Sequence, residues 1–197
     1  TDIALMDTWS KDASERMKIK IDARVLTDIL TDVAAANKGA TAGRISADLN
    51  IGVAGTPVAI TKTNAIDQIV NMGTVLDEAN CPESDRFIVI PAKLAGHIKL
   101  SDLKDASITG DGSSPLRNGR LGMIDRFTIY VSHNLYKSGS EFSILAGHKS
   151  GFTFASQMTN METIRSETTF GNIIRGLQVY GYKVVKPEAL AVGVITV

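Results

Sequence analysis

The sequence predicts an α+β protein, and three observations point to that class. A long amphipathic segment opens the chain, short β-branched segments fill its later part, and helices and strands do not alternate strictly. Strict alternation is typical of a doubly wound parallel sheet, so its absence favours α+β. With 197 residues, of which 44% are hydrophobic, the chain is long enough for one substantial core or two small interlocked ones.

Residues 6–38 predict one long helix. The segment contains no proline and no glycine, and most of its apolar residues recur three to five positions apart, as on one stripe of a helix. These residues are Met6, Trp9, Ala13, Met17, Ile21, Leu26, Leu30 and Val33. Gly39 suits the position that follows a helix. The alternating sequence KIKID leaves open a break near Ile19, but a single helix is the favoured interpretation.

The next segments mix loop, helix and strand signals. Glycines and small residues make 39–57 a predicted loop, with a short strand around 49–53. Amphipathic spacing predicts a second helix over 63–79 and a third over 92–103. Between them, the sequence RFIVIP at 86–91 has the β-branched composition and turn-forming borders of a buried strand.

The later part of the chain is richer in strands. A polar, glycine-bearing loop is predicted over 107–114, ahead of the sequence PLRNGRLGMIDRFTIYVSHNL. There Asn118-Gly119 predicts a tight hairpin turn, because both residues tolerate positive φ. Alternating apolar and polar residues predict strands over 127–131, 142–145, 151–155, 162–165 and 173–185.

Charge and cysteine content exclude several classes of protein. Lysine plus arginine and aspartate plus glutamate number 21 each, and this balance argues against a protein that grips nucleic acid by its phosphates. The single cysteine, Cys81, excludes a disulfide within the chain and a cysteine-rich zinc site, and it suits the reducing cytoplasm. No apolar run approaches the ~20 residues that span a bilayer, so no membrane association is expected.

Catalytic and cofactor signatures are not found. His97, His133 and His148 have no carboxylate or cysteine at ligand spacing, and no phosphate-binding glycine loop is completed. The acidic residues Asp102, Asp105 and Asp111 do not match a calcium loop. We therefore expect no enzyme, no metal and no cofactor. The alternative is a small α+β enzyme or ligand-binding domain whose site assembles in space around His97, His133 or Asp105.

Two arginines in the C-terminal strands are more informative. Arg165 and Arg175 lie within or beside predicted strands, where an unpaired charge would be costly to bury. We expect a carboxylate partner, Glu162 or Glu167, either in the same subunit or across a subunit boundary. Plain exposure on a sheet edge is the competing interpretation.

Four stretches together resemble the major capsid proteins of tailed bacteriophages, which have the Hong-Kong-97-type fold. The stretches are RFIVIPAKLAGHIKL at 86–100, LRNGRLGMIDRFTIYVSHNL at 116–135, ILAGHKSGFTFASQ at 144–157 and ETIRSETTFGNIIRGLQVYGYKVVKPEAL at 162–190. Each is a packing motif of low specificity. Their order along the chain is that of the family, and the resemblance extends from about residue 6 to the end.

The resemblance implies a division into two domains. The long helix, 6–38, would be the spine helix of a peripheral domain that comprises 1–50 and 156–184, and an axial domain would comprise 51–155 and 185–197. The family has an N-terminal arm and a long extended hairpin ahead of this helix. Because the present sequence starts close to the helix, we expect a truncated core fragment that lacks both.

The resemblance also implies a function and partners. The protein would be a structural subunit of an icosahedral phage capsid, made in the bacterial cytoplasm, with pentamers and hexamers of itself, scaffolding and portal proteins as partners and packaged DNA contacted only non-specifically. Arg165, Arg175, Glu162, Glu167, Asn118 and Gly119 are the candidate interface or structural residues. An encapsulin-like compartment shell is the nearby alternative.

Overall fold

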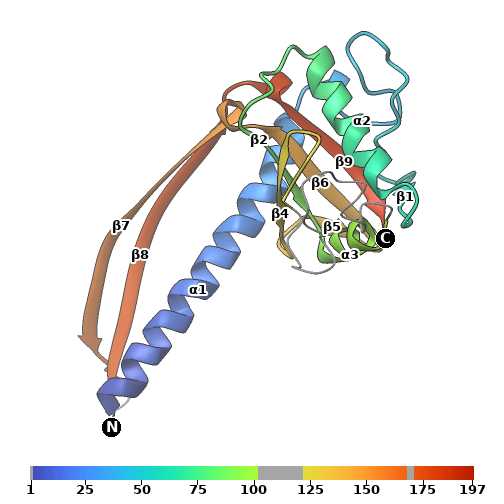
Figure 1. The fold of residues 1–197 in the computed structure, drawn as a ribbon. Coiled ribbons are helices and arrows are strands. Elements are labelled where there is room, and N and C mark those ends of the chain that lie inside the picture. The colour runs from blue at the N-terminus through green and yellow to red at the C-terminus, as the bar shows by residue number, and fades with distance from the viewer. Residues whose placement is uncertain (1, 102–121, 168–170) are drawn as a thin grey trace.

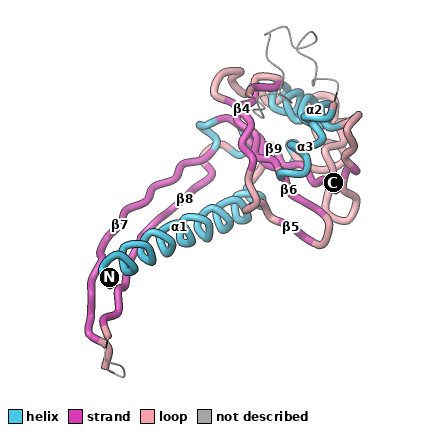
Figure 2. Tube along the Cα trace, turned by 60° about the horizontal axis from the view of Figure 1, so that its bottom comes forward, coloured by secondary structure: helices cyan, strands magenta, loops and turns pink. Residues whose placement is uncertain are grey.

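The computed structural model describes residues 2–101, 122–167 and 171–197. They form a body built on a mixed sheet and an arm that projects from it, as Figure 1 shows. The arm consists of the helix α1 (Asp2–Asp28) and the two-stranded hairpin of β7 (Phe152–Arg165) and β8 (Asn172–Val184). Figure 2 shows the same arrangement from a second direction, with α1 again alongside the hairpin.

The body holds the remaining elements. Its helices are α2 (Ala65–Glu78) and α3 (Ala92–Leu100), with short 3₁₀ segments η1 (Ile29–Asp32), η2 (Ala35–Asn37), η4 (Lys149–Gly151) and η5 (Pro187–Ala189). Its strands are β1 (Val58–Ala59), β2 (Arg86–Ile90), β3 (Met123–Ile124), β4 (Phe127–Val131), β5 (Lys137–Ser138), β6 (Glu141–His148) and β9 (Leu190–Thr196). The predicted α+β class is confirmed.

The body sheet has the strand order β1-β9-β6-β2-β4-β3, and β5 pairs with β6 outside this path. The pairs β1–β9 and β2–β4 are parallel, and the others are antiparallel. The core of the body joins this sheet to α2 and α3. Its fully buried side chains include Ile69, Met72 and Leu76 of α2, Leu94 and Ile98 of α3, and Ile88, Ile90, Phe127 and Ile144 of the sheet.

A second buried cluster attaches the arm to the body. Ile21, Val25 and Ile29, at the C-terminal end of the helical segment, pack with Leu145 and Leu190 of the body sheet. The opposite end of α1 is far more open, since Trp9 is 74% exposed. The arm is therefore anchored at one end and projects at the other.

The predicted helix over 6–38 is ten residues too long at its C-terminal end. The α-helix ends at Asp28, a 3₁₀ turn follows, and Val33 is extended with φ −71° and ψ 142°. Contacts with the body replace helical hydrogen bonds beyond this point. The Ala34 N–H donates to the Pro187 carbonyl at 3.2 Å, and the Asn37 side-chain amide donates to two carbonyls near η5. The helix is unbroken at Ile19, because the polar residues of KIKID lie on its solvent side.

Other element boundaries also differ. The strand expected around 49–53 is absent, and only isolated bridges, Ala42 with Leu49 and Val53 with Thr56, form there. α3 ends at Leu100 rather than at residue 103. The separate strands expected over 151–155 and 162–165 are one strand, β7. The predicted Asn118-Gly119 turn and the 107–114 loop lie outside the described residues.

A hairpin turn that the sequence did not indicate joins β3 to β4. Its two central residues, Asp125 and Arg126, have φ of 46° and 65°. Positive φ at both positions is the conformation of the tight turn that best fits the twist of paired strands. No glycine or asparagine marks this turn, so its sequence signal is weak. Among the described helices, none is long and apolar enough to cross a membrane.

Candidate assembly surface

The hairpin of the arm has two chemically different faces. Side chains alternate between faces along a strand. Gln178, Tyr180 and Tyr182 of β8 face α1, where they line a cavity of about 580 Å³ together with α1 residues such as Met17 and Ile21. The odd-numbered residues of β8 therefore point away from the helix. We call the side they occupy the outer face.

A bulge in β7 decides which of its residues reach the outer face. Met158 pairs with Gln178, but Asn160 pairs with Leu177, so β7 has one residue more than β8 at this point. An extra residue re-aims every side chain that follows it. Beyond the bulge, Glu162 therefore stands opposite Arg175 on the outer face.

The outer face combines apolar side chains with an ion pair. Ile173 is 48% exposed, Leu177 58% and Val179 54%. Between Ile173 and Leu177, the Arg175 guanidinium donates to the Glu162 carboxylate across the two strands. A protruding hairpin with three half-exposed aliphatic residues on one side has the composition of a contact surface.

The structure places the predicted arginine and glutamate residues in different situations. Arg175 is paired within the subunit, to Glu162, one of the two expected partners. Glu167 is exposed near the hairpin tip, and Arg165 is the last residue of β7. Asn118 and Gly119 are outside the described residues. An interface role for these six residues remains a prediction.

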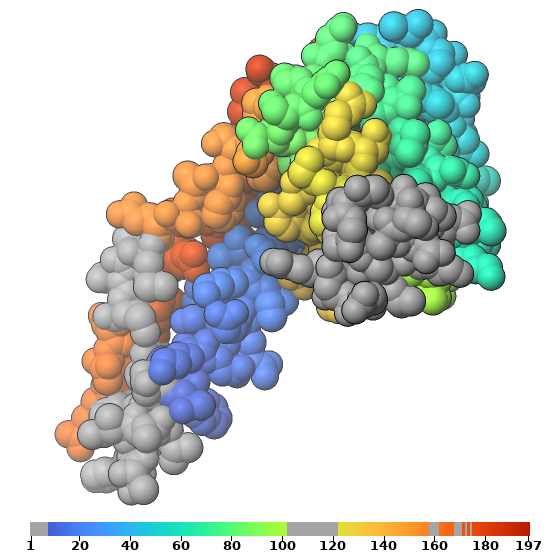
Figure 3. Space-filling model, viewed as in Figure 1, coloured from blue at the N-terminus to red at the C-terminus, as the bar shows by residue number. Residues whose placement is uncertain are grey.

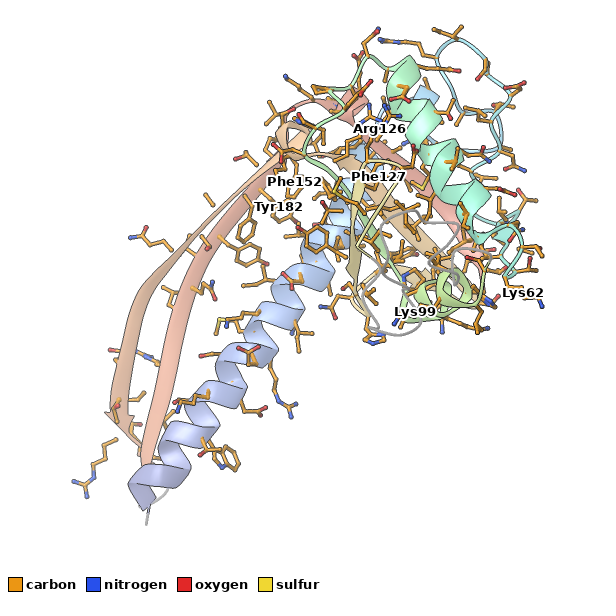
Figure 4. The ribbon with its side chains drawn as sticks, viewed as in Figure 1. Lys62, Lys99, Arg126, Phe127, Phe152 and Tyr182 are labelled. Atoms are coloured by element: carbon orange, nitrogen blue, oxygen red, sulfur yellow. The ribbon has the colours of Figure 1, made fainter. Side chains whose placement is uncertain are left out.

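The root of the arm is held by a small polar cluster beside the second hydrophobic cluster. The Tyr182 hydroxyl donates to Asp28, and the Arg24 guanidinium donates to the same carboxylate at 2.7 Å. These hydrogen bonds, that of Tyr182 first, lower the pKa of Asp28. Figure 4 shows Tyr182 and Phe152 at the level where the hairpin meets the body. The cluster ties the end of α1 to β8.

A buried charge network lies in the body, at the C-terminal end of α2. Arg86 is 1% exposed, donates to the carbonyls of Cys81 and Pro82, and pairs with Asp77 at 2.7 Å. Arg126, from the turn between β3 and β4, also pairs with Asp77 at 2.7 Å. Burial works against ionisation of Asp77, but hydrogen bonds from the two arginines outweigh it and lower its pKa. The network fixes the end of α2 to the start of β2 and to the turn.

The residues considered for an enzyme or metal site do not form one where they are described. His97 lies in α3 and His133 follows β4, while the His148 ring accepts the Ser150 N–H at 3.1 Å. No group of three or more histidine, cysteine or acidic side chains in the described part of the chain is placed to hold a metal ion. Asp102, Asp105 and Asp111 fall in an undescribed range.

Comparison with known proteins decides between the remaining interpretations. The profile of the family described as "Phage capsid protein" matches residues 1–193, almost the whole chain. The chain belongs to this family. It is a structural protein of a bacteriophage capsid, as the resemblance implied, and neither the encapsulin nor the enzyme alternative is favoured. No curated protein sequence matches the chain.

Two solved structures show that the fold is shared with phage capsids. A chain from Mycobacterium phage Che8 has a TM-score of 0.71 and 24% identity, and the match covers 93% of this chain and 61% of that one. A chain from the capsid of the cyanophage P-SCSP1u has a TM-score of 0.61 and 16% identity, with 96% and 65% covered. This capsid protein thus has the Hong-Kong-97-type fold, and it spans less than two thirds of the length of either chain.

Sequence reasoning missed the apolar part of the outer face, although a signal was present. In NIIRGLQVYGYKV, Ile173, Leu177 and Val179 are all odd-numbered, and residues separated by even numbers lie on the same face of a strand. Their partners on β7 change parity at the bulge, and nothing in the sequence marks that position. The sequence of the capsid protein could therefore indicate which residues of β8 share a face, but not which residues of β7 lie on that face beside them.

Proposed function

We propose that this capsid protein assembles with copies of itself into an icosahedral shell, and that the outer face of its hairpin is one of the contact surfaces. The single observation that carries the proposal is the exposure of Ile173, Leu177 and Val179 on a projecting hairpin, within a chain of the capsid family. Figure 3 shows how far the arm extends beyond the body, which gives it reach toward a neighbouring subunit.

The arm and the body correspond in outline to the peripheral and axial domains. In this proposal α1 and the hairpin form the peripheral domain, and the sheet with α2 and α3 forms the axial domain. Residues 37–50 contact the body, since Asn37 donates to the carbonyls of Glu188 and Leu190 and Ala42 is part of the body core. These contacts support a peripheral segment that ends near residue 36.

The capsomers would be pentamers and hexamers, with scaffolding and portal proteins as assembly partners and no enzymatic step. The balanced charge of 21 basic and 21 acidic residues supports a loose, non-specific contact with packaged DNA, because strong phosphate binding requires a basic excess. Assembly would take place in the host cytoplasm.

The proposal is tested by expressing the complete gene product with its scaffolding protein and imaging the result by negative-stain electron microscopy. We expect closed shells, or sheets of capsomers. Dispersed small particles would contradict the assembly function.

A matched pair of variants tests the surface itself. Leu177→Asp places a charge on the outer face and should lower the shell yield about tenfold or more, as for a central contact residue. Thr163→Asp introduces the same charge on the same hairpin, on the side of α1, at an exposed residue. Equal yields from the two variants would remove the outer face from the proposal.

A further inference from the structure

The loop 43–48 presents one apolar side chain to solvent in a fixed position. Ile45, in this loop, is 81% exposed, more than any other large apolar residue of the described part of the chain. The loop protrudes beside α2 in Figure 1. A single exposed isoleucine is ordinary on a protein surface, so the exposure alone has no consequence. The exposure of Ile45 becomes significant because the loop that carries it is held in one conformation.

Hydrogen bonds on both sides fix the loop. Ala42 and Leu49 close it through two backbone bonds of 2.9 and 3.0 Å. At its tip, the Glu78 carboxylate of α2 accepts the N–H groups of Ile45 and Ser46 at 2.8 and 3.1 Å. A loop held in one conformation before binding loses little entropy when it binds. Ile45 therefore has the properties of a preorganised anchor.

A cavity suited to such an anchor lies next to the loop. It has a volume of about 470 Å³ and an apolar part formed by Ala34, Ala79, Cys81, Pro82, Pro187 and Ala189. Glu188 lines its edge, and Arg44 of the loop pairs with Glu188 at 2.7 Å. The loop and the cavity are thus adjacent parts of one surface, although Ile45 does not fill the cavity of its own chain.

Two charges complete the match. Asp48 lies on the loop and Lys186 lines the cavity, and both are exposed. Neither has an ion-pair partner among the residues that the structure describes. They are opposite in sign, so a copy that brings its loop to the cavity can bring Asp48 to Lys186.

We propose that Ile45 of one capsid protein inserts into this cavity of a second copy, with Asp48 of the first copy against Lys186 of the second. The adjacency of loop and cavity suits a reciprocal contact, in which each copy supplies both parts around a two-fold axis. The inference rests on the proposed function, since it assigns a second copy as the partner.

Cys81 in the wall of the cavity provides a direct test. Ile45→Cys is introduced into the complete gene product, and the assembled particles are oxidised at mildly alkaline pH, because burial raises the pKa of the Cys81 thiol. We expect a disulfide-linked dimer on a non-reducing gel. The control Ile45→Cys with Cys81→Ala should give at least tenfold less dimer. Equal dimer from both proteins, or a disulfide formed only within the chain, overturns the proposal.

A second measurement separates this contact from the capsid function. Ile45→Asp should lower the shell yield about tenfold, whereas Val70→Asp, at an exposed apolar residue of α2, should leave it unchanged. If Ile45→Asp assembles like the wild type, the loop contact is wrong and the capsid function stands. If the wild type itself forms no particles, the proposed function fails instead.

Discussion

Tyr182 of the hairpin donates its hydroxyl hydrogen to Asp28, the last residue of α1, so the two parts of the arm are joined side chain to side chain at its root. The same carboxylate also accepts the Arg24 guanidinium. The ionised form of Asp28 is therefore the one that holds the helix and the hairpin together, and its pKa is lowered accordingly. This makes the joint sensitive to acid.

The first prediction concerns Tyr182→Phe, which removes the hydrogen bond and keeps the ring. A carboxyl whose pKa is lower in the folded state than in the unfolded state stabilises the folded state. The full stabilisation is present above the unfolded pKa of about 4, and it is lost as the pH falls through the lower pKa of the folded state. The variant should melt at a lower temperature than the wild type at pH 7, and the gap should narrow at pH 3. Thermal unfolding followed by circular dichroism measures both. A gap that is unchanged at pH 3 would show that Asp28 is not the partner that matters.

The second prediction concerns Gly52, in the loop between η2 and β1, where β9 passes close to the chain. The φ of Gly52 is +86°, and a Cβ there would lie 1.9 Å from the Val194 carbonyl oxygen. Gly52→Ala should destabilise the fold by about 3 kcal/mol or more, since strain and a backbone clash add. Chemical denaturation gives the value.

Gly55 is the matched control for this substitution. Its φ of +89° is nearly the same, but no atom lies within 4 Å of the position of its Cβ. Gly55→Ala should therefore cost only the backbone strain, about 1–2 kcal/mol. If the two variants lose the same stability, the close approach of Gly52 to β9 has no energetic weight.

The third prediction concerns the buried network around Arg86. Arg86→Ala leaves the Cys81 and Pro82 carbonyls without their donor and takes one arginine from Asp77, so we expect a loss of about 2–4 kcal/mol. Arg126→Ala removes a half-exposed partner of the same carboxylate and should cost about 1 kcal/mol or less. Urea denaturation of the two variants compares them. An equal loss would contradict the larger contribution that we expect from the buried Arg86 than from the half-exposed Arg126.

The fourth prediction separates folding from assembly at Arg175. The pair with Glu162 is exposed on both sides, so Arg175→Ala should change the unfolding free energy by less than about 1 kcal/mol. In the complete gene product it should reduce the shell yield markedly, because it lies on the proposed contact face. A variant that assembles normally and melts at a lower temperature would show that the pair with Glu162 serves the stability of the subunit and not assembly.

Local patterns of the sequence were sufficient for the short buried elements. RFIVIP predicts β2 because β-branched residues are bounded by turn formers, and the alternation from Phe127 to Val131 gives β4 with both ends correct. The end of the long helix, in contrast, is set by tertiary contacts. The stripe through Leu30 and Val33 has helical spacing, yet these residues leave the helix because the body supplies hydrogen-bond partners to Ala34 and Asn37.

The candidate surface was predictable only in part. The chemistry of Arg175 and Glu162 could be anticipated, since a charge in a strand requires a partner. Their exact pairing depends on a bulge that leaves no mark in the sequence, and Ile45 gains its significance from Glu78, which lies 33 positions away. Such relationships exist only once the chain is folded.

The bulge between Met158 and Asn160 also constrains how the length of this hairpin can change. Deleting the one extra residue there would restore uninterrupted pairing and leave Glu162 opposite Arg175 on the outer face, because every pair beyond the bulge keeps its present partner. Deleting one residue of β7 anywhere beyond the bulge would instead turn the side chains that follow it to the other face. Adding or removing residues in twos, equally in both strands, would keep every side chain on its own face. Related hairpins should therefore differ in length by even numbers, unless the bulge itself is gained or lost.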